Sequence, residues 1–148
     1  MGKEIDALVK ELKDQIFEET KEAFGEAAYQ RWLNPLYKGS LDNPDGYARL
    51  QGRCGDTLEI FLKFDGEKVK EAAFLTDGCG AITACGSFVA EMSLGRSPDE
   101  ILDITAEGIM EKLGGLPKDE AHCASLAAET LQEALSDYMV KQTKRAKA

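Results

Sequence analysis

The sequence predicts an α+β fold in which a three-stranded antiparallel sheet is covered on one side by helices. Residues 58–64 alternate as a half-buried strand should and are followed by an Asp-Gly turn, whereas from Gly80 onward the apolar positions recur about every 3.6 residues. A sheet with one apolar face must bury that face, and the helices that follow it along the chain can cover it. With 148 residues the chain is large enough to bury one core, so we expect a single domain over residues 1–148.

The first expected element is a long amphipathic helix over residues 4–33. We expect it to weaken near Gly25, to resume, and to end at Asn34-Pro35, because proline disfavours helix in the residue before it. The following stretch, "NPLYKGSLDNPDG", is rich in turn-forming residues and predicts a connector to the core, which we place at residues 47–140. The apolar residues with the spacing of one helix face are Ile5, Leu8, Val9, Leu12 and Ile16.

Three consecutive strands are expected to form the sheet. Residues 47–51 suit a short first strand, and residues 57–64 alternate as a half-buried second strand should. Asp65-Gly66 predicts a hairpin turn, because glycine readily adopts the positive φ that such turns need. Residues 68–75 then return as the third strand.

Helices are expected to form the rest of the chain. "SPDE" at Ser97–Glu100 has the pattern of a capping box with proline at the first helical position, and Thr105 is a second expected cap for a helix that ends at Gly114-Gly115. The last helix is expected to start at Asp119 or His122 and to run to the tail. Its predicted buried face consists of Cys123, Leu126, Ala127, Thr130, Leu131, Ala134, Leu135 and Tyr138.

Charge and termini exclude several classes of function. The formal net charge of −9 repels phosphate backbones, which argues against a nucleic-acid partner. The first 19 residues are acidic from position 4 onward and contain no long apolar run, so they predict neither a secretory signal nor a membrane span. We therefore expect a cytoplasmic protein without a membrane partner. Thiols stay reduced there, so the four cysteines are poor candidates for disulfides.

Two cysteines in "TDGCGAITACG" have different expected roles. Cys79 lies between two glycines at a strand-to-helix junction, where the helix N-terminus favours the thiolate that binds metal or attacks sulfur. Cys85 belongs instead to an apolar helical stripe with Ile82, Val89 and Met92, and a small buried cysteine is the simpler interpretation there. We expect Cys79 to be functional and Cys85 to fill the core.

Further potential ligands lie at the starts of two other elements. Cys54 precedes the second strand, and Asp56 follows it after one glycine. His122 and Cys123 stand at the start of the last helix. Because adjacent helical residues diverge by about 100°, we do not expect a simple base and nucleophile pair unless the turn is irregular. Three thiols with Asp56 or His122 as the fourth ligand would make a plausible metal site.

With these residues in place, the chain resembles the iron–sulfur cluster assembly scaffolds of the IscU type, also seen as the N-terminal domain of NifU. The resemblance rests on "GRCGDTLEIFLK", "FLTDGCGAITACGS", "LGRSPDEILDIT" and "LGGLPKDEAHCASLAAETL", in that order. It implies that Cys54, Cys79 and Cys123 hold a nascent cluster, that Asp56 keeps the cluster labile and that His122 is an alternative ligand. It also implies the same α+β fold and a pyridoxal-phosphate cysteine desulfurase as sulfur donor.

The leading hypothesis is therefore a scaffold, not an enzyme, that assembles a labile [2Fe–2S] cluster and passes it to apo-proteins. Cys123 is the expected persulfide acceptor, because it opens a helix whose dipole favours the thiolate. Exposed sites at element ends would keep the cluster within reach of its acceptor. The alternative is a zinc-binding sulfurtransfer protein or desulfurase activator, in which zinc replaces the cluster. The expected partners are a desulfurase, apo iron–sulfur proteins and, as a further possibility, a second copy of the chain.

Overall fold

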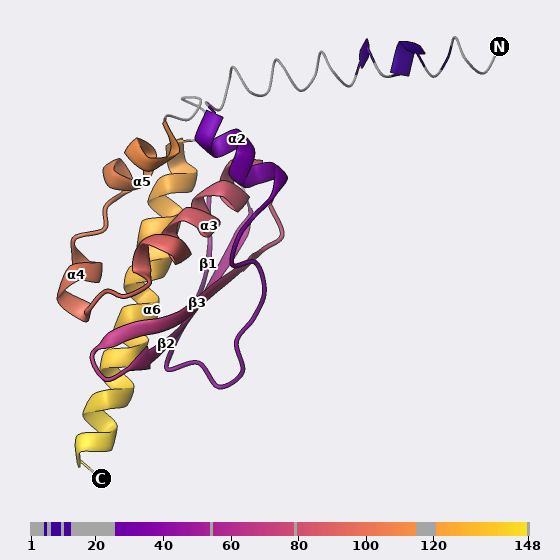
Figure 1. The fold of residues 1–148 in the computed structure, drawn as a ribbon. Helices are drawn as coiled ribbons and strands as arrows, with labels where there is room; N and C mark the ends of the chain where they lie inside the picture. Colours follow the sequence, from indigo (N-terminus) through magenta and orange to yellow (C-terminus); the bar gives the residue numbers. More distant parts are fainter. Residues whose placement is uncertain are drawn as a thin grey trace.

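The computed structural model describes residues 5, 7–9, 11–12, 26–53, 55–78, 80–114 and 121–147, and its α+β class is the expected one (Figure 1). The elements follow the chain in the order α2 (Glu26–Leu33), β1 (Gly46–Gln51), β2 (Thr57–Asp65), β3 (Lys68–Thr76), α3 (Gly80–Ser93), α4 (Pro98–Leu102), α5 (Ala106–Leu113) and α6 (Ala121–Lys147). Of the helix expected over residues 4–33, residues 5, 7–9, 11 and 12 and all of α2 are helical. Ile16 and Gly25 lie outside the described residues.

The sheet is an antiparallel meander with the strand order β1-β2-β3. The expected alternation places Leu58, Ile60 and Leu62 on one face of β2, where all three are fully buried. Gly66 takes the predicted positive φ, +65°, in the turn between β2 and β3. Leu58 of β2 lies opposite Thr76 of β3, so the β1–β2 turn and the end of β3 are at the same end of the sheet.

Two helices cover the apolar face of this sheet. The long helix α6 contacts β1 and β2, α3 contacts β3 and β2, and the two helices contact each other. The predicted face of α6 is buried from Cys123 to Tyr138, with Leu131 and Ala134 completely inaccessible. Figure 1 shows α6 extending the full length of the sheet and beyond it to the C-terminus.

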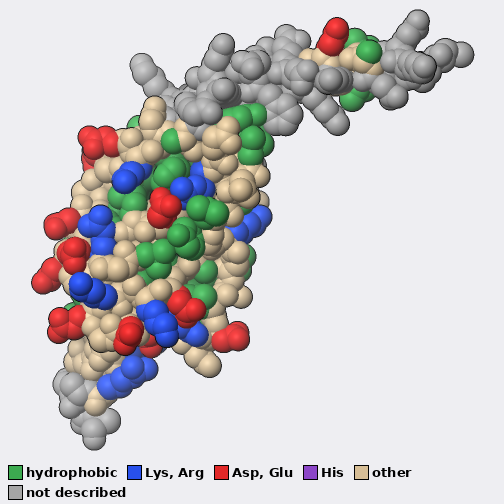
Figure 2. Space-filling model, in the orientation of Figure 1, with side chains coloured by type: hydrophobic (Ala, Val, Ile, Leu, Met, Phe, Trp, Pro, Cys, Tyr) green, Lys and Arg blue, Asp and Glu red, His purple; other side chains and the backbone are tan. Residues whose placement is uncertain are grey.

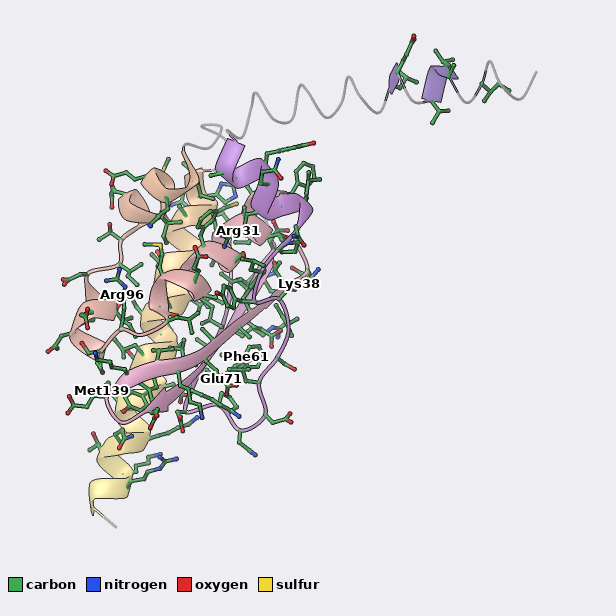
Figure 3. All side chains as sticks on the ribbon, viewed as in Figure 1. Arg31, Lys38, Phe61, Glu71, Arg96 and Met139 are labelled. Carbon is green, nitrogen blue, oxygen red and sulfur yellow. The ribbon has the colours of Figure 1, made fainter. Side chains whose placement is uncertain are left out.

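The helix α3 is buried on every side, and not only along the expected stripe. Residues 80–90 are all buried, because α2, α5 and α6 pack on α3 in addition to the sheet. Arg31 of α2, labelled in Figure 3, donates a 3.1 Å hydrogen bond to Ser87 Oγ and pairs with Glu91 at 3.2 Å. Its guanidinium also lies 4.0 Å from the centre of the Phe88 ring.

The helix caps agree with the sequence, whereas the connector contains an unexpected pairing. Ser97 and Glu100 form the predicted capping box, and Thr105 Oγ1 accepts the Gly108 amide hydrogen bond at 3.1 Å. The connector had been expected only as a turn-rich link. Its residue Lys38, however, forms an isolated parallel bridge with Phe74 of β3. The pairing uses backbone groups, so it leaves no side-chain pattern in the sequence.

One face of the molecule is mixed in charge. On the face drawn in Figure 2, acidic and basic side chains are interspersed around a central group of apolar side chains. Among the described residues, there is no helix whose length and hydropathy would allow it to cross a bilayer.

Candidate functional site

The candidate site lies at the end of the sheet where three segments meet: the β1–β2 loop (residues 52–56), the β3–α3 junction (residues 77–79) and the first turns of α6. The meander brings the first two segments together, and α6 packs along β1 from the same end. Cys54 and Cys79 belong to these segments in sequence, but both lie outside the described residues.

The β1–β2 loop is closed by hydrogen bonds within itself. The Gly52 amide donates to the Asp56 carbonyl at 2.8 Å, and the Gly55 amide donates to the Gly52 carbonyl at 3.0 Å. Gln51 Nε2 donates to the Gly55 carbonyl at 3.1 Å. Gly55 adopts a φ of +88°, which explains why glycine separates Cys54 from Asp56.

The start of β2, which follows the β1–β2 loop, is bonded to the end of β3 and to the β3–α3 junction. Asp77 Oδ1 accepts a 2.7 Å hydrogen bond from the Thr57 amide, and Thr76 Oγ1 donates a 2.6 Å hydrogen bond to the Thr57 carbonyl. The same Thr76 hydroxyl oxygen accepts the Gly78 amide at 3.0 Å. Hydrogen bonds from the backbone and side chain of Thr57 hold the pKa of the Asp77 carboxyl below its ordinary value.

The carboxylate of Asp56 lies against Gly78. A Cβ placed on Gly78 would be 2.8 Å from both Cγ and Oδ2 of Asp56, and 2.4 Å from Cγ2 of Ile82. Any larger residue would have to displace both the Asp56 carboxylate and the Ile82 side chain. The predicted oxygen ligand therefore lies beside the residue that immediately precedes Cys79.

The start of α6 contacts the β1–β2 loop from the other side. A Cβ on Gly52 would lie 3.0 Å from Leu126 Cδ2, so this glycine allows the loop and helix to approach closely. Next to that contact is an open pocket of about 360 Å³ whose lining comes from the end of β1 and the first turns of α6, and includes Arg53, His122 and Glu129.

His122 and Cys123 are in contact, contrary to the expectation from ideal helix geometry. His122 Nε2 lies 3.7 Å from Cys123 Sγ. Although the two Cα–Cβ bonds diverge, the long imidazole side chain reaches back to the sulfur at the first turn of α6. The two side chains are therefore closer than the ideal 100° divergence suggests, and a base and nucleophile pair stays a prediction for this irregular arrangement.

Cys123 was expected both on the buried face of the last helix and at an exposed ligand site, and the structure confirms only the first of these expectations. Cys123 is only 3% exposed, whereas His122 and Asp56 are half-buried. Cys123 is on the face of α6 that joins the core, and this placement outweighs its position near the helix end. Cys85 is 0% exposed, in agreement with its expected packing role.

The structure thus describes three of the five predicted ligands and leaves the complete set a prediction. Asp56 is held near the Cys79 segment, and His122 and Cys123 form a second group across the β1–β2 loop. Within the described part of the chain, no group of three or more His, Cys, Asp or Glu side chains is arranged to hold a metal ion.

Sequence reasoning missed the parts played by Thr57, Thr76 and Asp77. Thr76-Asp77-Gly78 directly after a strand is typical of a turn in which side chains bond to nearby backbone groups. That signal was available in the sequence. The partner, Thr57 at the start of β2, could not be identified in this way, because it depends on the register between β2 and β3.

Comparisons with known proteins agree with this fold. Residues 23–145 match the NifU-like N terminal domain. The iron-sulfur cluster assembly scaffold protein IscU 1 of Archaeoglobus fulgidus is 34% identical over 122 residues, covering 82% of this chain and 80% of that protein. The corresponding IscU protein of Aquifex aeolicus is also 34% identical, covering 80% of this chain and 78% of its own length.

A solved structure gives the same result at the level of the fold. The crystal structure of a nitrogen-fixing NifU-like protein (N-terminal) from Brucella abortus has a TM-score of 0.67 at 18% identity, covering 82% of this chain and 97% of that one. The domain match spans most of the chain, and the two IscU relatives are similar over most of their own length. The chain therefore belongs to the NifU-like N-terminal domain family.

Proposed function

We propose that the chain is a scaffold on which a labile [2Fe–2S] cluster is assembled and from which it is transferred to apo-proteins. The observation that carries this proposal is the convergence of the β1–β2 loop, the β3–α3 junction and the start of α6 at one end of the sheet. Each of these three segments contains one of Cys54, Cys79 and Cys123 in sequence. The names of the two IscU relatives support the same function.

The proposed ligands are the three cysteines, with Asp56 or His122 completing the set. Thiolates are the usual ligands of iron–sulfur clusters, and a carboxylate is a harder and more weakly held ligand to iron. Asp56 would thus be the easiest ligand to release. Its position against Gly78 supports this role, because the carboxylate lies next to the Cys79 segment without being enclosed in the core.

Sulfur delivery is proposed to begin at Cys123. Its thiolate would attack the outer sulfur of a persulfide on a cysteine desulfurase, forming a new S–S bond and releasing the desulfurase cysteine as a thiolate. Reduction of each transferred sulfur to sulfide then takes two electrons from an external donor. His122 Nε2, 3.7 Å from Sγ, is near enough to accept the Cys123 proton in the tautomer that leaves this nitrogen unprotonated.

Anaerobic reconstitution of the apo chain with iron and sulfide tests the proposal. The expected product is coloured, with sulfur-to-iron charge-transfer bands, and loses its colour to an apo iron–sulfur acceptor. A colourless protein that keeps one zinc ion through the same treatment would overturn the proposal and favour the zinc-binding sulfurtransfer function.

A further inference from the structure

We propose that Thr57, Thr76 and Asp77 form a clamp that fixes the two cysteine-bearing loops relative to each other, with Asp77 acting as a positioning residue and not as a ligand. This inference rests on the proposed scaffold function, because it assigns a role to residues around the same site. It concerns the arrangement of Cys54 and Cys79, which the clamp residues flank in sequence.

Three hydrogen bonds make up the clamp. Asp77 Oδ1 accepts a hydrogen bond from the Thr57 amide at 2.7 Å, and Thr76 Oγ1 donates one to the Thr57 carbonyl at 2.6 Å. The Thr76 hydroxyl oxygen also accepts a hydrogen bond from the Gly78 amide at 3.0 Å. Both backbone groups of Thr57 are therefore engaged by side chains from the end of β3. The two bonds to Thr57 join the start of β2, next to the Cys54 loop, to the end of β3, next to the Cys79 junction, and the third bond lies within that junction.

The clamp is close to both cysteines along the chain. Cys54 is three residues before Thr57, and Cys79 is two residues after Asp77. Segments of two or three residues are short, because an extended residue spans at most about 3.6 Å. Fixing Thr57 to Asp77 therefore limits how far the two cysteines can separate.

The Asp77 carboxylate is oriented for this role. Asp77 is exposed, yet its Oδ1 accepts the backbone amide of Thr57 at the start of β2. The nearby Asp56 carboxylate lies instead against Gly78, which has no room for a Cβ. Two neighbouring carboxylates thus have different tasks: Asp56 is available as a ligand, and Asp77 holds the loops.

A fixed pair of loops would favour cluster assembly for an entropic reason. Two thiols held close together bind a shared iron centre with a high effective concentration, whereas thiols on separate loops must first be ordered. Loss of the clamp should therefore weaken every process that needs both thiols. It should affect single-thiol reactions far less.

The chain provides a matched control for Asp77. Asp45 Oδ2 accepts the Phe64 amide at 2.8 Å, which is the same kind of bond at the opposite end of the sheet. Asp45→Ala removes a carboxylate-to-amide bond without touching either cysteine loop. If Asp77 matters only for general stability, the two alanine variants should behave alike.

The first measurement needs no metal. In the full chain carrying Cys85→Ala and Cys123→Ser, the equilibrium between the Cys54–Cys79 disulfide and glutathione gives the effective concentration of one thiol for the other. Asp77→Ala and Thr76→Val are each expected to lower this concentration several-fold. Asp77→Asn, which keeps an acceptor oxygen, should restore most of it, and Asp45→Ala should leave it unchanged.

The second measurement uses Co²⁺ with all four cysteines present. Asp77→Ala is expected to weaken Co²⁺ binding several-fold, while the spectrum at saturation keeps the thiolate-to-cobalt bands of the parent. A changed saturated spectrum would instead make Asp77 a ligand and overturn the positioning role. Circular dichroism and thermal unfolding of each variant check that the fold is retained.

The outcomes separate this inference from the proposed function. Suppose that the parent forms a cluster but that Asp77→Ala has the same effective thiol concentration as the parent; this result overturns the clamp alone. The clamp is also overturned if the Cys54 and Cys79 thiols of the parent show no preference for each other over glutathione. If the parent builds no cluster, but Asp77→Ala lowers the effective thiol concentration, the clamp is supported and the scaffold function is refuted.

Discussion

Replacing Cys85 should lower the free energy of unfolding without abolishing cluster binding. Cys85 is 0% exposed within the core that α3 shares with the sheet and the neighbouring helices. Cys85→Ala removes one buried sulfur, which is worth about 1 kcal/mol of transfer free energy. A residual cavity of about 20 Å³ adds about 0.5 kcal/mol, so the total loss is about 1.5 kcal/mol.

This loss converts to a measurable shift in the melting temperature. The entropy of unfolding is about 2.1 cal/mol/K per residue, or about 310 cal/mol/K for 148 residues. The melting temperature of the apo protein should therefore fall by about 5 °C in Cys85→Ala. Cys85→Ser should fall somewhat further, because it also buries a hydroxyl group.

Cys123→Ser is the matched comparison for this experiment. Cys123 is buried to almost the same extent, at 3% exposed, so its substitution should also lower the melting temperature. Only this variant is expected to lose the chromophore after anaerobic reconstitution. Loss of the chromophore in the Cys85 variant, with circular dichroism unchanged, would refute the assignment of Cys85 to packing.

Three further predictions concern the residues around the site. Asp56→Ala should retain the cluster longer than the parent, because it removes the most weakly held ligand; faster decay of the chromophore against a chelator would contradict this. Asp77 has a pKa below its ordinary value of 3.8, so its stabilising effect is present above the unfolded-state pKa and is lost as pH falls through the folded-state pKa. The urea midpoint of Asp77→Asn should therefore lie below that of the parent at pH 7 and approach it in strong acid. An equal difference between the two midpoints at both pH values would contradict this role of the Asp77 carboxylate. After incubation with desulfurase and cysteine, mass spectrometry should detect one added sulfur atom chiefly on Cys123, and an adduct mainly on Cys54 or Cys79 would refute the acceptor role.

The sheet and the helix ends could be predicted because their signals are local. The Asp65-Gly66 turn fixes the hairpin between β2 and β3, and the capping box at Ser97 fixes the start of α4. In each case a few adjacent residues determine the backbone conformation through steric preference or a short-range hydrogen bond. Such signals survive whatever tertiary packing surrounds them.

Features that depend on two distant segments could not be predicted from the sequence. The burial of α3 on every side follows in part from the packing of α2, which Arg31 anchors through Ser87 and Glu91, 56 and 60 residues further along the chain. The bond between Thr57 and Asp77 likewise spans 20 residues. Periodicity identifies which face of a helix is apolar, but not which elements cover it.

The two groups of predicted ligands are attached to the fold in different ways, and this difference bears on sulfur delivery. Asp56 lies beside two segments that are joined by two hydrogen bonds to Thr57, whereas the first turns of α6 meet the β1–β2 loop through packing of Leu126 on Gly52. Cys123 is 3% exposed, so a desulfurase persulfide can reach its sulfur only after a local displacement. Separating Leu126 from Gly52 breaks an apolar contact, while separating the loops breaks hydrogen bonds made by Thr57. The contact at α6 is therefore the one expected to open for sulfur delivery, with the loop pair remaining assembled beside it.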